Sequence, residues 1–84
     1  MQGLVSVIIP VRNGSRYLRE AIQSVLDQDY EPIEVIVADN GSEDDSRTVA
    51  AAMPGPVRVI EEPTPGAGHA RNAGVRLAMG EYVA

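Results

Sequence analysis

Two turns with the same residues, Asn-Gly-Ser, are the first candidates for contact with a ligand. They occupy residues 13–15 and 40–42, and at each an apolar β-branched run stops and a helix-like pattern begins. The two turns are 27 residues apart, from 13 to 40, close to the roughly 30 residues that a strand, a crossover helix and a parallel strand require. Ligands of open parallel sheets bind beyond the carboxyl ends of the strands, so these turns should face a ligand.

Asp39 directly precedes the second turn, at the end of an apolar run. A carboxylate at that position can accept hydrogen bonds from the imide or amide edge of a nucleobase. The alternative is a local bond to the backbone of Gly41 or Ser42, which aspartate forms readily in turns between a strand and a helix. The sequence leaves both roles open.

The segment from Gly66 to Arg71, Gly-Ala-Gly-His-Ala-Arg, is a second candidate. It resembles a dinucleotide-binding fingerprint only weakly, because Arg71 replaces the last glycine and the segment follows the third predicted strand. A helix start with an arginine in its first turns still offers positive potential to a phosphate. The alternative is an ordinary loop whose arginine pairs with Glu61 or Glu62. His69 is the only histidine and predicts no metal site.

The composition excludes several classes of function. The net charge is -5 and no basic run occurs, so a nucleic-acid partner is not expected. All seven basic residues are arginine, which excludes P-loop and Schiff-base chemistry because both need a lysine. The chain has no cysteine and no apolar stretch near the roughly 20 residues that span a bilayer. These features predict a cytoplasmic protein without a membrane span.

The pattern of apolar residues predicts one small α/β domain. A helix is expected after each of the first three strands, with Ser15 as the N-cap of the first helix and Ser42 with Asp45 as a capping box for the second. Alternating strands and helices predict a Rossmann-like, three-layer α/β/α architecture with a mostly parallel sheet. The predicted strands are 5–10, ended by Pro10, then 33–38, 57–60 and one beginning at 82.

Four segments in order, 5–13, 18–28, 35–42 and 66–74, closely resemble the amino-terminal half of family 2 glycosyltransferases with the GT-A fold. The resemblance covers nearly the whole chain. It implies that the protein binds a nucleoside-diphosphate sugar. It also implies that Pro10, Val11 and Arg12 line the pocket for base and ribose, that Asp39 contacts the base edge, and that Arg71 holds the anionic side of the site.

The chain departs from the family pattern at Asn40, where the family commonly has a second acidic residue. In the family, an Asp-x-Asp motif that binds a divalent metal, Mg²⁺ or Mn²⁺, follows the segment that ends here at Ala84. The carboxylate that activates the acceptor lies further on. The resemblance therefore implies that residues 1–84 are a partial nucleotide-sugar-binding domain, truncated before that motif. This chain is expected to be inactive by itself and to hold no catalytic and no metal-binding residue.

Two other functions remain open. The chain could be a self-contained, flavodoxin-like or receiver-like binding module. Receiver chemistry, however, needs clustered acids after the first strand and a later lysine, and this chain has Arg12-Asn13 at that place and no lysine. It could also be an assembly piece that forms a homo-oligomer when its free sheet edge pairs with a second copy.

Overall fold

The computed structural model describes residues 4–28, 32–53, 55–78 and 82–83. Strands and helices alternate through these ranges. The strands are β1 Val5–Val11, β2 Ile33–Asp39, β3 Val57–Glu61 and β4 Tyr82–Val83, and the helices are α1 Ser15–Leu26, α2 Ser46–Ala51 and α3 Ala67–Leu77.

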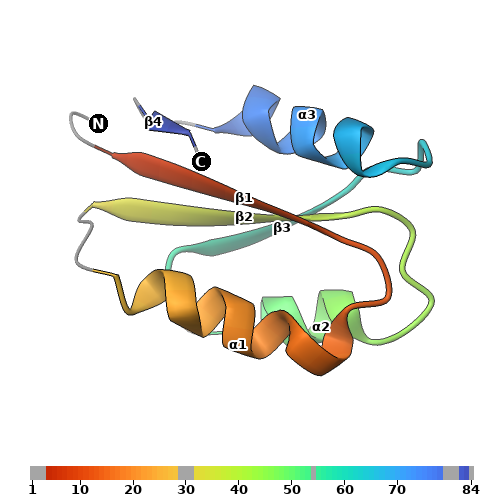
Figure 1. The fold of residues 1–84 in the computed structure, drawn as a ribbon, viewed down its shortest axis with the longest axis horizontal. Coiled ribbons are helices and arrows are strands. Elements are labelled where there is room, and N and C mark those ends of the chain that lie inside the picture. The colour runs from red at the N-terminus through yellow and green to blue at the C-terminus, as the bar shows by residue number, and fades with distance from the viewer. Residues whose placement is uncertain (1–3, 29–31, 54, 79–81, 84) are drawn as a thin grey trace.

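The strands form one sheet in the order β3-β2-β1-β4, and every described pairing is parallel. β1 and β2 pair along their whole length, from Val5 opposite Ile33 to Val11 opposite Asp39. Helices α1 and α2 cover one face of the sheet, and α3 lies on the other (Figure 1). The predicted three-layer architecture with a parallel sheet is therefore confirmed, and the carboxyl ends of β1 and β2 meet at one edge.

Pro10 does not end the first strand, as the sequence predicted, but lies inside β1. Val11 accepts the backbone N–H of Asn40 on the β2 side, and backbone groups of successive strand residues point to opposite sides. The nitrogen of Pro10 therefore faces away from β2. The described part of β4 pairs only with Val5 and Ser6, so the proline replaces no described ladder bond.

The main core lies between the sheet and the helix pair α1 and α2. Leu18 and Ile22 of α1 are four residues apart and fully buried, because that spacing brings side chains to one face of a helix. Val35 and Val37 of β2 meet them from the sheet, where alternate residues share a face. The remaining buried members of this core are Val11 and Ala50.

Helix α3 packs closely on the opposite face because its contact residues are small. Ala70 and Ala73 are buried there. A Cβ atom added to Gly74 would lie 2.6 Å from Cγ2 of Ile8 in β1, so only glycine fits this approach. Among the described residues, no helix is long and apolar enough to cross a membrane.

Candidate functional site

The two Asn-Gly-Ser turns lie side by side at the carboxyl ends of β1 and β2, and they bind each other. The backbone N–H of Asn13 donates to the hydroxyl of Ser42 over 2.9 Å. In return, the side-chain oxygen of Asn13 accepts the backbone N–H of Glu43 over 2.7 Å. Asn13 has a φ of 53°, a left-handed conformation that asparagine tolerates better than most residues. The first turn therefore forms a reciprocal contact with the second turn and the residue that follows it.

The loop after β2 also caps helix α1. Gly14 is the N-cap residue of this helix and makes no side-chain cap bond. Its backbone N–H donates to the hydroxyl of Ser46 over 3.0 Å, and the N–H of Ser15 donates to the carboxylate of Asp44 over 3.1 Å. The prediction that Ser15 is the N-cap is therefore wrong, because side chains from the neighbouring turn satisfy these helix donors.

The predicted capping box of the second helix is also wrong. Helix α2 begins at Ser46, and its N-cap residue Asp45 makes no side-chain cap bond. Ser42 lies four residues before the helix, and its hydroxyl accepts the N–H of Asn13 instead. Asp44 instead accepts the hydroxyl and the N–H of Ser46. The Ser46 hydroxyl bond, aided by the backbone N–H bonds of Ser15 and Ser46, lowers the pKa of Asp44 from 3.8 to about 2.

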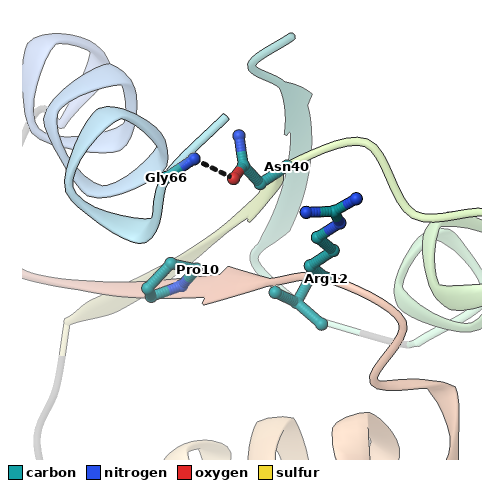
Figure 2. A pocket seen from close by; sticks show the side chains of 5 residues that line it. Pro10, Arg12, Asn40 and Gly66 are labelled. Carbon is teal, nitrogen blue, oxygen red and sulfur yellow. Dashed lines mark hydrogen bonds between the residues drawn. The ribbon is translucent and has the colours of Figure 1, made fainter. Parts of the chain in front are cut away.

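A pocket of about 240 Å³ lies beside this edge, on the face of the sheet that carries α3. Figure 2 shows Pro10 on β1 and Arg12 just beyond the end of this strand. They face Asn40 and Gly66, the residue before α3. The structure therefore brings together three of the residues predicted to bind a nucleotide. The residues that line the pocket are Pro10, Val11, Arg12, Asn40 and Gly66.

Asn40 builds the wall of this pocket, a role that the sequence analysis missed. Its side-chain NH₂ donates to the carbonyl oxygens of Glu62 and Thr64, both over 2.8 Å, and its side-chain oxygen accepts the N–H of Gly66 over 2.8 Å (Figure 2). A carboxylate could not donate the first two bonds. The N–H of Thr64 donates to the carboxylate of Glu62, which lowers the pKa of Glu62.

Asp39 is not among the residues that line this pocket. Successive strand residues point to opposite faces, so Asp39 lies on the face of α1 and α2 while Asn40 lies on the face of α3. The Asp39 side chain is only 1% exposed. Its Oδ2 accepts the N–H of Ser42 over 3.1 Å. This is the local turn bond that the sequence offered as the alternative to a contact with a nucleobase. Its Oδ1 is buried and has no partner among the described residues.

Two arginines predicted to meet the ligand remain accessible. Arg12 and Arg71 are both exposed, and within the described ranges neither makes a hydrogen bond or an ion pair. Arg71 lies in α3, but it does not line the pocket. The alternative pairing of Arg71 with Glu61 or Glu62 is not observed, because these carboxylates pair with Arg47 and Arg76 instead.

The described residues do not form a metal site. They contain no group of three or more histidine, aspartate or glutamate side chains that could hold a metal ion. The buried Oδ1 atom of Asp39 is a single unpartnered oxygen, whereas Mg²⁺ requires octahedral coordination. The donor set of the described chain therefore does not fit a divalent metal by itself.

Known proteins resemble this chain over nearly its full length. A glycosyltransferase of Rickettsia prowazekii, described as uncharacterized, is 43% identical over 79 residues, which cover 94% of this chain and 25% of that protein. Glycosyltransferase GlyG of Streptococcus pneumoniae is 39% identical over 87 residues, which cover 99% of this chain and 29% of that protein. The chain thus spans between a quarter and a third of the length of these two relatives.

Two solved structures share the fold. S. aureus TarS, residues 1–349, superposes with a TM-score of 0.87 at 30% identity, covering 99% of this chain and 26% of that one. The mannosyltransferase PcManGT from Pyrobaculum calidifontis, solved in complex with GDP-Man and Mn²⁺, has a TM-score of 0.83 at 32% identity, again covering 99% and 26%. These structures confirm the predicted first half of a GT-A fold. Since residues 6–84 also match the family model Glycosyl transferase family 2, the chain belongs to that family.

Proposed function

We propose that this chain is the nucleotide-binding half of an enzyme that transfers a sugar from a nucleoside-diphosphate sugar to an acceptor. The observation that carries the proposal is the pocket formed by Pro10, Val11, Arg12, Asn40 and Gly66 at the carboxyl ends of β1 and β2. Parallel α/β sheets bind ligands at this edge. PcManGT, which shares the fold, was solved with the sugar nucleotide GDP-Man.

The pocket offers groups suited to a base and ribose. Pro10 provides apolar surface, and the Arg12 guanidinium has no protein partner among the described residues. Val11 lies between them, with its side chain buried in the core of α1 and α2. A free guanidinium can stack on a planar base and donate hydrogen bonds to it. We assign Pro10, Val11 and Arg12 to the base and ribose. This assignment follows the sequence-based prediction and is supported by their common position in the pocket.

Asp39 and Arg71 have separate roles in the proposal. The Asp39 Oδ1 atom is an acceptor without a partner in the described structure, and a buried acceptor gains most from a new donor. We assign this atom to an N–H of the base edge, because Asp39 directly precedes Asn40, which lines the pocket. Arg71 is exposed on α3, and we assign it to the anionic diphosphate, for which arginine is well suited.

The proposal places no catalytic residue and no metal ligand in this chain. PcManGT was solved with Mn²⁺, and we expect a divalent cation, Mg²⁺ or Mn²⁺, to act in the complete enzyme. Its ligands would have to come from outside the described residues, which contain no suitable cluster. The cytoplasmic location and the homo-oligomer through the free sheet edge remain predictions.

Calorimetric titration of the complete protein with UDP, GDP and ADP tests this function. We expect one of these nucleotides to bind. Arg12→Gln should weaken the affinity for this nucleotide about tenfold, because the variant loses a charged donor in the pocket. Arg19→Gln is the matched control, since it removes the same charge from an exposed position on α1 outside this pocket. Asp39→Ala should weaken binding at least as much as Arg12→Gln. If none of the three nucleotides binds, the proposed function is wrong.

A further inference from the structure

Two carboxylates lie next to each other at the ends of β2 and β3. Asp39 is the register partner of Glu61 in the parallel pairing of these strands, so both side chains emerge at the same level of the sheet. Asp39 is buried and Glu61 is largely exposed. Two negative charges at this separation repel each other, and the repulsion is strongest for the buried group. The arrangement therefore needs a nearby cation.

Arg47 of α2 supplies that cation. Its Nε atom lies 3.7 Å from Oδ2 of Asp39, and its NH1 group is hydrogen-bonded to Glu61. The guanidinium thus bridges the two carboxylates, and half of the side chain remains exposed. Within the described part of the chain, no other arginine forms an ion pair with Asp39.

The contacts of Asp39 all fall on one of its two oxygens. Oδ2 accepts the N–H of Ser42 and faces Arg47, whereas Oδ1 has no described partner. A carboxylate held at one oxygen from two directions has a fixed orientation, and its second oxygen is left for a donor.

We propose that Arg47 is a positioning residue for nucleotide recognition, and that it acts through Asp39. By bridging Asp39 and Glu61, it keeps the buried carboxylate in place and leaves Oδ1 as the acceptor for a ligand donor. This inference rests on the proposed function, because it requires Asp39 to contact a bound nucleotide. Arg47 itself does not line the pocket described above.

The chain contains a matched control for this arginine. Arg76 of α3 pairs with Glu62 over 3.8 Å, and its side chain is 68% exposed. It neutralises a neighbouring glutamate in the same way, but it makes no ion pair with Asp39. Substitution of Arg76 therefore removes one positive charge and one ion pair without changing the surroundings of the buried carboxylate.

Titration of the complete protein with UDP, GDP and ADP tests the inference. We expect Arg47→Gln to weaken the affinity for the bound nucleotide by about tenfold or more, since it leaves a buried charge uncompensated. Arg76→Gln should change this affinity by less than about twofold. Arg47→Lys should give an intermediate loss, because one ammonium group cannot bridge two carboxylates as a guanidinium does.

A double-mutant cycle separates positioning from a general loss of structure. When Asp39→Asn is already present, Arg47→Gln should have less than about a twofold further effect on affinity, because its partner carboxylate is gone. Equal losses with Arg47→Gln and Arg76→Gln, or an undiminished loss in the Asp39→Asn background, would overturn the inference. If Arg47→Gln does not fold, the affinity of Arg47→Lys decides the test. An Arg47→Lys variant that binds the nucleotide as tightly as the wild type would overturn the inference. Wild-type protein that binds none of UDP, GDP and ADP contradicts the proposed function instead, and the assignment of Arg47 fails with it.

Discussion

The two Asn-Gly-Ser tripeptides have identical side chains but different environments. In the first, Asn13 is exposed and binds only the neighbouring turn. In the second, Asn40 is 7% exposed and fixes the 62–66 loop with three hydrogen bonds. Both turns lie between a strand and a helix, the first between β1 and α1 and the second between β2 and α2. The two copies of a repeated motif can therefore lie at the same edge of a sheet and still have different roles.

The glycines of the two turns also differ in their environments. Gly14 is buried, and an added Cβ would lie 2.6 Å from Cγ2 of Val11 and 2.6 Å from the hydroxyl of Tyr17. Gly41 is exposed and has open space around it, but its φ is +79°. One glycine is required by packing and the other by backbone conformation. The two demands can be separated by mutation.

The largest effect is expected where the two asparagines are changed to aspartate. Asn40→Asp removes both donors to the carbonyl oxygens of Glu62 and Thr64 and places a carboxylate against them. We expect a loss of about 3 kcal/mol in the free energy of unfolding, because buried polar groups are left unpaired. Asn13→Asp can still accept the N–H of Glu43 and should cost less than about 1 kcal/mol.

Urea unfolding at neutral pH measures both changes. Asn40→Asp should also weaken nucleotide binding, since the residue lines the pocket and holds Gly66 beside it. Equal stability of the two variants would show that the bonds from Asn40 do not hold the loop, and the contrast between the turns would then disappear.

A smaller effect is expected from alanine at the two glycines. Gly14→Ala forces Cβ against the buried Val11 and should cost about 2 kcal/mol, as overpacking of a core does. Gly41→Ala has room, but it must adopt a left-handed conformation, which costs about 1 kcal/mol. Because Val11 lines the pocket and Gly41 does not, only Gly14→Ala should also reduce nucleotide affinity. Thermal unfolding and calorimetry distinguish these outcomes, and a larger loss for Gly41→Ala would contradict the packing argument.

The fold was predictable from the sequence because its signals are local and repeated. The run Val5 to Ile9 and the run Ile33 to Ala38 are apolar as buried parallel strands require, and the helix between them has its apolar residues on one face. The extension of β1 through Pro10 was not predictable, since it depends on the pairing partner: Val11 accepts the N–H of Asn40, and the nitrogen of Pro10 faces away from β2.

The site was predictable only in part because its details are tertiary. The spacing of the turns identified the edge, and three adjacent predicted residues, 10–12, share one pocket. The capping predictions failed because Ser42, Asp44 and Ser46 bind the first turn, about 30 residues earlier in the chain. The opposite orientations of Asp39 and Asn40 follow from strand alternation, but the partners of Asn40 lie in a loop whose path no local pattern encodes.

The smallest expected effect on stability occurs only at acidic pH, and it concerns the contact between the turns. The hydroxyl bond from Ser46 lowers the pKa of Asp44 from 3.8 to about 2 in the folded protein. A carboxyl group with a lowered folded-state pKa stabilises the protein above its unfolded pKa, and this contribution is lost as the pH falls toward the folded value. Wild-type protein should therefore lose stability between pH 3.8 and about 2, and Asp44→Asn should lose less over that range.

Urea midpoints at about pH 5, above this window, and at about pH 2, at its lower end, measure the difference. Asp45→Asn is the matched control, since it removes the same charge one residue later and leaves the bonds of Asp44 to Ser15 and Ser46 in place. The control should retain the acid-dependent loss of the wild type. If Asp44→Asn and Asp45→Asn decline in parallel, then Asp44 does not couple the second turn to helix α1. The link between the two segments then rests on the bonds of Asn13 to Ser42 and Glu43 and of Gly14 to Ser46.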